Sequence, residues 1–162
     1  MDLNQYTVVT QGHNLVVMVP RGSNLESQCI AYSKSNPYVF TDTMMYSATQ
    51  SAEYVYDANH TEGFLTFCQD LVLTPGTYQV NMILKIDNVD NDNIGSADVS
   101  YNYGAGILYS SPISAGQADN DGSLLISYEF TCHEPVIGAE IRFYSLGNAD
   151  IKLEHLEYSM IQ

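Results

Sequence analysis

The feature that most constrains this chain is an alternation of apolar and polar side chains at every second position. The apolar members of the four clearest segments are Tyr78, Val80, Met82, Leu84 and Ile86, then Val99, Tyr101 and Tyr103, then Leu124, Ile126, Tyr128 and Phe130, then Ala139, Ile141 and Phe143. Successive side chains of a β-strand point to opposite faces, so this period places one face of each segment on a core. Because no window of a dozen residues carries a helical stripe with caps, the sequence predicts a chain built from strands.

Shorter segments and the turns between them extend this prediction. We expect further strands at residues 6–10, 15–19, 28–32, 38–41, 52–56, 64–67, 70–73 and 151–158. Pro75 and Gly76 form a turn before Tyr78, since proline presets φ and glycine accepts a positive φ. Many strands separated by frequent turns predict an all-β fold, an antiparallel β-sandwich. The 162 residues contain no evident linker, so we expect a single domain over residues 1–162, with residues 1–50 the least defined part.

The charge of the chain limits its partners. There are 19 acidic residues against 5 Lys and Arg, which gives a formal net charge of −14. A negative field of this size repels phosphate backbones and anionic membrane surfaces, so neither nucleic acid nor membrane is expected as a partner. A neutral ligand, a cation or a basic partner is compatible with this charge, and so is a role in solubility alone.

The cysteines and the chain ends carry little further information. Cys29, Cys68 and Cys132 lie far apart and form no CxxC pair, which argues against a zinc ribbon or a thioredoxin-like motif. We expect reduced thiols in a core, with one disulfide as the alternative. A secretory signal and an apolar stretch of membrane-spanning length are both missing from the sequence, and either a cytoplasmic protein or an excised domain agrees with this.

Two segments resemble a known family. The first runs from Glu62 through Leu73, Thr74, Pro75 and Gly76 to Val80, and the second covers residues 128–130, 134–144 and 147–151. Together they resemble the galactose-binding-like jelly-roll fold of many carbohydrate-binding modules, especially accessory β-sandwich domains of bacterial enzymes that build surface polysaccharides. The resemblance covers residues 62–160 and implies a glycan or polysaccharide as partner. The chain departs from many such modules because it contains no Trp on which a sugar could stack.

The candidate ligand-binding residues follow from the strand period. Glu140, Arg142 and Tyr144 share one face of their strand, because residues i, i+2 and i+4 point to the same side. Asn81 and Lys85 share the polar face of the strand over residues 78–86, and Asp98 belongs to the polar face of the next one. If these strands lie in one sheet, the six side chains form a polar patch in which Arg142 and Glu140 pair with sugar hydroxyls and Tyr144 stacks. The alternative is a solvated sheet face with cross-strand ion pairs such as Arg142 with Asp98.

Other candidates are weaker. Tyr54 and Tyr56 share a strand face and could form a stacking platform, or they could pack beneath a loop. The loop with Asp87, Asp90 and Asp92 and the loop over residues 119–121 offer oxygens to calcium, but neither matches an EF-hand. We therefore expect no cofactor, with a structural calcium ion as the alternative that the resemblance implies.

Signatures of covalent chemistry are missing from the sequence. It contains neither a G-x-S-x-G elbow, nor a Walker loop, nor a G-x-G-x-x-G strand-to-helix turn. Cys132 and His133 are adjacent, and neighbours on a strand point to opposite faces, which disfavours direct activation of the thiol. The prediction is a non-catalytic carbohydrate-binding module. The alternatives are a protein-interaction or assembly domain, including a homodimer or a unit that contacts other domains of a parent enzyme, and a small enzyme on the same scaffold.

Overall fold

The computed structural model describes residues 1–12, 15–39 and 57–162. In these ranges the strands are β1 (Tyr6–Gly12), β2 (Leu15–Pro20), β3 (Tyr38–Val39), β4 (Asp57–Asn59), β5 (Glu62–Leu73), β6 (Gly76–Asp87), β7 (Asn93–Tyr101), β8 (Gly106–Ser114), β9 (Ser123–Cys132), β10 (Val136–Leu146) and β11 (Asp150–Met160). One α-helix, α1 (Glu26–Ser35), and two short 3₁₀ turns, Leu3–Gln5 and Ala115–Gln117, complete the described structure. Within these ranges the helix is neither long nor apolar enough to cross a membrane.

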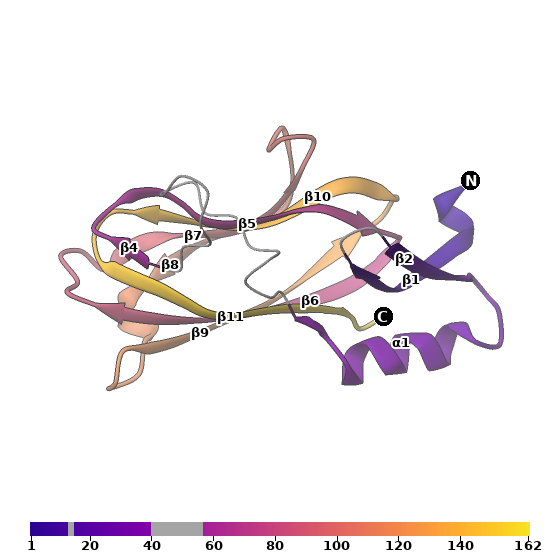
Figure 1. Ribbon diagram of the computed structural model, residues 1–162, viewed down its shortest axis with the longest axis horizontal. Helices are drawn as coiled ribbons and strands as arrows, with labels where there is room; N and C mark the ends of the chain where they lie inside the picture. Colours follow the sequence, from indigo (N-terminus) through magenta and orange to yellow (C-terminus); the bar gives the residue numbers. More distant parts are fainter. Residues whose placement is uncertain (13–14, 40–56) are drawn as a thin grey trace.

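Two antiparallel sheets pack face to face and form a β-sandwich (Figure 1). One sheet has the strand order β5-β10-β7-β8, and the other has the order β3-β11-β6-β9, with β4 also paired to β11. From β4 to β11 the chain passes back and forth between the sheets, except at the β7–β8 hairpin. This order of eight strands is that of a jelly roll. The predicted all-β jelly-roll sandwich is confirmed.

The core lies between the two sheets and follows the period seen in the sequence. Buried positions alternate with exposed ones along β9 and with half-buried ones along β10, and Ile141, Phe143 and Leu84 are fully buried. Tyr78 is the largest fully buried side chain of the described residues, and its ring stacks on Phe130 at a centroid distance of 5.3 Å. Its hydroxyl donates to the Thr74 carbonyl oxygen at 2.8 Å, and burial raises the pKa of Tyr78 to about 12. The polar tip of this core tyrosine is thereby satisfied inside the protein.

The β1–β2 hairpin and α1 form an arm that covers one end of the sandwich (Figure 1). Gln11 donates to the Val72 carbonyl and accepts from the Val72 amide at 3.1 and 2.8 Å, and it also contacts the Tyr158 hydroxyl. Ser33 of α1 accepts from the Met160 amide at 3.1 Å. These hydrogen bonds attach the arm to strands of both sheets.

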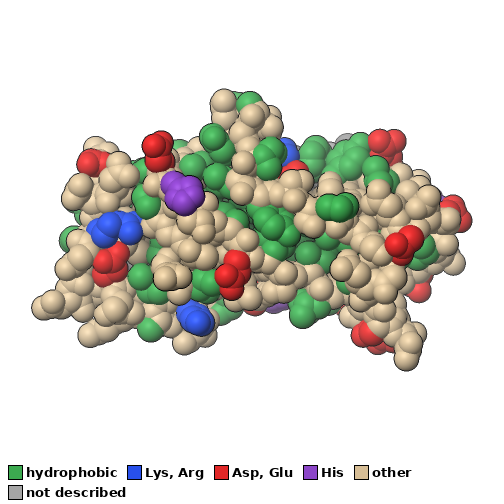
Figure 2. Space-filling view, turned by 180° about the vertical axis from the view of Figure 1, so that it is seen from behind, with side chains coloured by type: hydrophobic (Ala, Val, Ile, Leu, Met, Phe, Trp, Pro, Cys, Tyr) green, Lys and Arg blue, Asp and Glu red, His purple; other side chains and the backbone are tan. Residues whose placement is uncertain are grey.

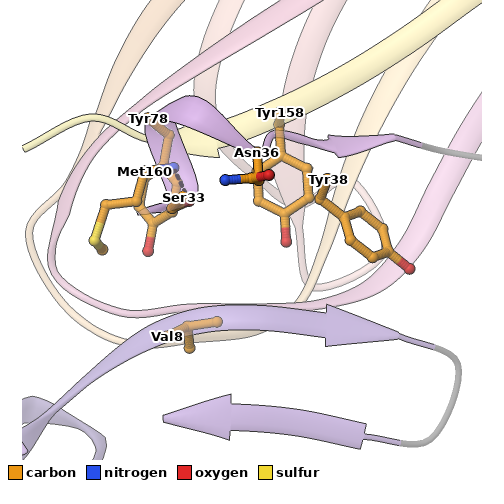
Figure 3. A pocket seen from close by; sticks show the side chains of 7 residues that line it. All are labelled: Val8, Ser33, Asn36, Tyr38, Tyr78, Tyr158 and Met160. Atoms are coloured by element: carbon orange, nitrogen blue, oxygen red, sulfur yellow. Dashed lines mark hydrogen bonds between the residues drawn. The ribbon is translucent and has the colours of Figure 1, made fainter. Parts of the chain in front are cut away.

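A small cavity remains where the arm meets the sandwich (Figure 3). Its lining consists of Val8, Ser33, Asn36, Tyr38, Tyr78, Tyr158 and Met160. Within this lining, Val8 of β1 lies opposite Tyr78 of β6 and Tyr158 of β11. The volume of about 20 Å³ is enough for a single water molecule, so the cavity is a seam between packed elements rather than a ligand site.

The structure corrects several predicted elements. Residues 28–32 lie in α1 and not in a strand, and the prediction failed because the helix has no apolar stripe: only Ser33 of its side chains is buried, while Tyr32 is 56% exposed. The strand expected through Tyr103 ends at Tyr101, and β8 was not predicted at all. Residues 64–67 and 70–73 belong to one bulged strand, β5, and the strand expected at 52–56 lies outside the described residues.

Leu124 and Leu125 provide a direct test of the sandwich, because they are adjacent residues of the same type on β9 with opposite exposure, 2% and 64%. We expect Leu124→Ala to lower the free energy of unfolding by about 2–5 kcal/mol, since it leaves a cavity in the core. Leu125→Ala should change it by less than about 0.5 kcal/mol. Urea unfolding of the two variants measures the difference, and equal losses would contradict the assigned faces.

Candidate functional site

The six residues predicted to bind a ligand divide between the two outer faces of the sandwich. Glu140, Arg142 and Tyr144 on β10 lie beside Asp98 on β7, in the sheet β5-β10-β7-β8. Asn81 and Lys85 lie on β6, in the other sheet. The prediction of a single patch is therefore wrong, because β6 does not neighbour β7 or β10 and the outer faces of two packed sheets point away from each other.

Arg142 is held by acidic side chains of its own sheet. Its Nε and Nη2 donate to the two carboxylate oxygens of Asp98 at 2.7 and 2.9 Å, and Nη1 reaches Glu140 at 3.5 Å. The side chains of Arg142 and Asp98 are only 12% and 13% exposed, and the hydrogen bonds from Arg142 to Asp98 raise the pKa of the guanidinium. The cross-strand ion pair that formed the alternative prediction is confirmed. All three guanidinium nitrogens thereby have hydrogen-bond partners within the protein.

The aromatic side chains of this face are also engaged. The Arg142 guanidinium carbon lies 4.8 Å from the centroid of the Phe64 ring, which meets Tyr144 edge to face at 5.1 Å. The Tyr144 hydroxyl donates to Glu62 at 2.8 Å, and this hydrogen bond raises the pKa of the tyrosine. The cluster satisfies its own polar groups and leaves few of them for a ligand.

The outer face of the other sheet is a second self-contained network. Asn81 donates to Glu157 at 2.9 Å and accepts from Ser127 at 2.7 Å. Glu157 also binds the Nε2 atom of His155 at 3.0 Å. Lys85 lies 3.4 Å from the carboxylate of Asp121 and donates to its carbonyl oxygen. Asn81 and Lys85 are thus committed to neighbours in the same way as Arg142.

A groove lies where β8 and β9, the edge strands of the two sheets, come together with the loop between β9 and β10. It has a volume of about 260 Å³ and is lined by Tyr101, Leu108, Thr131, Cys132, His133, Glu134, Pro135 and Val136. Figure 2 shows this side of the molecule, with hydrophobic side chains gathered in its middle. Sequence reasoning missed the groove because its residues come from three separate segments that only the closed sandwich brings together.

Tyr101 supplies the aromatic surface of the groove. It is the last residue of β7, pairs with Ala139 of β10 and is half-buried. Its ring rests against Gly106, where a Cβ atom would lie only 2.2–2.7 Å from three of the ring atoms. A side chain at position 106 would displace the ring, so Gly106 leaves the space that the Tyr101 ring occupies.

The opposite wall is polar. Thr131 and Cys132 end β9, and the exposed His133 and Glu134 follow in the loop. The Cys132 thiol is buried and donates to the Glu134 carbonyl oxygen at 2.8 Å, and desolvation raises its pKa. A thiol with a raised pKa is a poor nucleophile, so this wall offers hydrogen-bonding groups rather than a reactive cysteine.

A tight turn between β7 and β8 connects the groove to the Arg142 cluster, and it projects above the upper sheet in Figure 1. Asn102, Tyr103 and Gly104 adopt φ values of 51°, 56° and 82°, in the left-handed region. A Cβ atom on Gly104 would lie 2.9 Å from the Nη1 atom of Arg142, so the turn rests on the guanidinium. Arg142 therefore supports the segment that carries Tyr101 and the 95% exposed Tyr103.

The acidic loops proposed for calcium use their carboxylates internally. Asp92 accepts from the Ser114 hydroxyl and the Gly116 amide, both at 2.7 Å, and Asp119 accepts from the Ser123 amide at 2.8 Å. Over residues 1–12, 15–39 and 57–162, His, Cys, Asp and Glu side chains form no group of three that could hold a metal ion. The Tyr54–Tyr56 platform lies outside the described residues.

Three loops meet at the end of the sandwich opposite the groove, around His60. Its Nδ1 atom lies 2.8 Å from Asp150 and its Nε2 atom 3.3 Å from Asp90, while Asn88 donates to Asp150 at 2.6 Å. The hydrogen bond from His60 to Asp150 raises the pKa of the histidine above its ordinary value of 6.5. Because both ring nitrogens face carboxylates, this contact is strongest with a protonated imidazole.

Comparison with known proteins gives matches only among solved structures. No protein-family model matches the chain, and no curated protein matches it. The chain is similar to a carbohydrate-binding module from a Cellvibrio mixtus lichenase in complex with cellotriose, at 12% identity and a TM-score of 0.41, over 73% of this chain and 86% of that one. It is also similar to the C-terminal module of a Zobellia galactanivorans laminarinase, at 10% identity and a TM-score of 0.45, over 76% and 99% of the two chains.

A third similar structure comes from a viral particle. This is the VP2 protein of infectious bursal disease virus, at 8% identity and a TM-score of 0.45, over 93% of this chain and 36% of that one. At these identities the likenesses concern fold only. The strand order independently defines the chain as a jelly-roll β-sandwich domain.

The Arg142–Asp98 pair can be tested as a structural unit. We expect Arg142→Leu to lower the free energy of unfolding by about 2–3 kcal/mol, because Asp98 keeps an uncompensated charge in a largely buried place. The double variant with Asp98→Leu should recover most of this loss. Urea unfolding of the single and double variants gives the coupling, and a loss below about 0.5 kcal/mol in each single variant would contradict the assignment.

The His60 contact predicts a pH-dependent stability difference between the wild type and His60→Asn, in which asparagine tolerates the φ of 47°. Since the folded state raises the pKa of His60, the stabilisation is complete below its ordinary value of 6.5 and is lost as the pH rises through the raised pKa. The folded state lowers the pKa of Asp150, so the stabilisation that its carboxylate contributes is lost only in strong acid. Urea midpoints should therefore differ most at about pH 5–6 and converge in alkaline buffer. His133→Asn, at the other end of the sheet, is the control, and a difference independent of pH would contradict the prediction.

Proposed function

We propose that this chain is a non-catalytic domain that binds a glycan in the groove between β8 and β9. The observation that supports this most directly is the placement of the Tyr101 ring, which packs over Gly106, in the same groove as the exposed residues His133 and Glu134. This arrangement replaces the polar sheet faces expected from the sequence. Their side chains bind one another, whereas the groove presents a ring and hydrogen-bonding groups to an open space.

The groove has the chemistry that sugar recognition requires. One face of a pyranose carries C–H groups that pack on an aromatic ring, and its hydroxyls need donors and acceptors at the rim. A volume of about 260 Å³ is small beside the roughly 300–1,000 Å³ of pockets that enclose a drug-sized molecule. The open groove has room for one sugar ring, which agrees with the recognition of a single unit in a longer glycan chain.

The same residues argue against catalysis in the groove. The Cys132 thiol is buried and hydrogen-bonded, and Glu134 is the single carboxylate among the residues that line the groove. Glycoside hydrolysis generally uses a pair of carboxylates on either side of the scissile bond. We also propose that binding needs no cofactor, since Asp92 and Asp119 of the two acidic loops accept hydrogen bonds from backbone amides of the protein.

A second candidate function, assembly with another protein, is favoured by one feature of the other sheet. Leu125 is 64% exposed on the edge strand β9 and lies directly opposite Ile83 of β6, on the outer face of β3-β11-β6-β9. An exposed apolar pair on a polar sheet face offers a small contact site to a partner. This function differs from the first in requiring a mass that rises with protein concentration.

Replacement of Tyr101 tests the proposed function. We expect Tyr101→Ala to weaken glycan binding at least tenfold, because the stacking surface is removed, whereas Tyr101→Phe should keep most of the affinity. Isothermal titration with the strongest ligand from a broad glycan array measures the change in affinity. Addition of a chelator should leave the affinity unchanged. Tyr32→Ala is the matched control, since Tyr32 is an exposed tyrosine of α1.

Two outcomes would contradict this proposal. One is the absence of any glycan ligand for a protein whose circular dichroism shows the expected β-structure. The other is ligand-induced chemical-shift changes that centre on Arg142 and Tyr144 and leave Tyr101 and Val136 unaffected, which would return the site to the sheet face.

A further inference from the structure

The positive charges of this protein are almost all neutralised by carboxylates. Among its 5 Lys and Arg residues, four lie within 4.0 Å of an acidic oxygen, in the pairs Arg21–Glu26, Lys85–Asp121, Arg142–Asp98 and Lys152–Glu154. The fifth, Lys34, lies in the last turn of α1. Since the formal net charge is −14, the unpaired charge of the surface is overwhelmingly negative.

The groove shares this sign. Glu134 contributes a carboxylate to its lining, and neither a lysine nor an arginine is among the residues that line it. Two cations lie near the groove, and carboxylates hold both of them. Arg142 supports the β7–β8 turn and is bound by Asp98 and Glu140. Arg21 donates to the carbonyl oxygen of Pro75, beside the strand pair Gly76–Cys132, and lies 3.8 Å from Glu26.

We infer that the groove takes a glycan with protonated amino groups, such as a chain of glucosamine, and rejects glycans with carboxylate or sulfate groups. This inference rests on the proposed function. A uronate or sulfate in the groove would face Glu134 without an available guanidinium or ammonium partner, and a like-charge contact of this kind opposes binding. An ammonium group would instead be attracted by Glu134 and by the field of the whole protein.

The size of the preference follows from the exposure of Glu134. A solvent-exposed pair of opposite charges contributes about 0.2–1 kcal/mol, which corresponds to an affinity ratio of up to about fivefold. Such a contact is screened by salt, so the ratio should fall as the ionic strength rises. The stacking on Tyr101 carries no net charge and should depend little on salt.

The test compares two ligands that differ only in their amines, glucosamine oligomers and N-acetylglucosamine oligomers of the same length, in mildly acidic buffer where the free amines are protonated. We expect the wild type to bind the glucosamine oligomer two- to fivefold more tightly at low salt. Glu134→Gln should remove this preference. Glu129→Gln is the matched control, because it removes one negative charge from β9 outside the groove and should leave the preference intact. Oligogalacturonate serves as the anionic probe and should bind more weakly than the N-acetylglucosamine oligomer, with the difference greatest at low salt.

Each result separates the inference from the function on which it rests. Equal binding of the two oligomers, with a loss of both in Tyr101→Ala, would overturn the amine preference and leave glycan binding in place. Binding of oligogalacturonate in the groove as tightly as the N-acetylglucosamine oligomer would overturn it as well. A preference that persists in Glu134→Gln assigns the effect to the overall field and overturns the role of Glu134. Absence of binding to every glycan removes the proposed function together with the inference.

Discussion

The structure depends on the burial of two apolar sheet faces against each other. Buried side chains of β6, β9 and β11 meet those of β5, β7 and β10, with Phe143 and Tyr78 as the largest among them. Removal of this apolar surface from water is the dominant favourable term in folding. Because successive side chains point to opposite sides of a strand, the same burial turns Asp98, Arg142 and Asn81 outward, and it brings the edge strands β8 and β9 together along one side.

The outer faces illustrate why polar side chains on a sheet are a weak sign of a binding site. Arg142 and Asp98 lie opposite each other on neighbouring strands, at a spacing that favours a cross-strand pair. Asn81 likewise finds Ser127 and Glu157 on the strands at either side. Groups that face a complementary neighbour a few ångströms away satisfy one another. A ligand finds available groups where strands end and partners are missing, as at Tyr101 and the loop after Cys132.

Much of the fold could be predicted from the sequence, and the errors have identifiable physical causes. Long strands with a buried and a solvated face were found from their period, as in β6 and β9. The sequence predicts a strand where the helix α1 lies, because the helix has no apolar stripe and packs on the sandwich through Ile30 and Ser33 alone among its apolar and buried side chains. The sequence also predicts a strand through Tyr103, which continues the period of Val99 and Tyr101, but the left-handed turn that begins at Asn102 ends β7 at Tyr101.

For this protein the sequence by itself determined the class of fold and the face on which each long strand is buried. It also determined that Asp98 could pair with Arg142 across two strands, and that the electric field of the protein is negative. These properties depend on residue type and local spacing. Only the tertiary structure decided that β6 and β10 belong to different sheets, and that Tyr101, Leu108 and Glu134 line one groove. The physical reason is that a groove is made by segments far apart in the chain, whose meeting depends on how the two sheets close over a shared core.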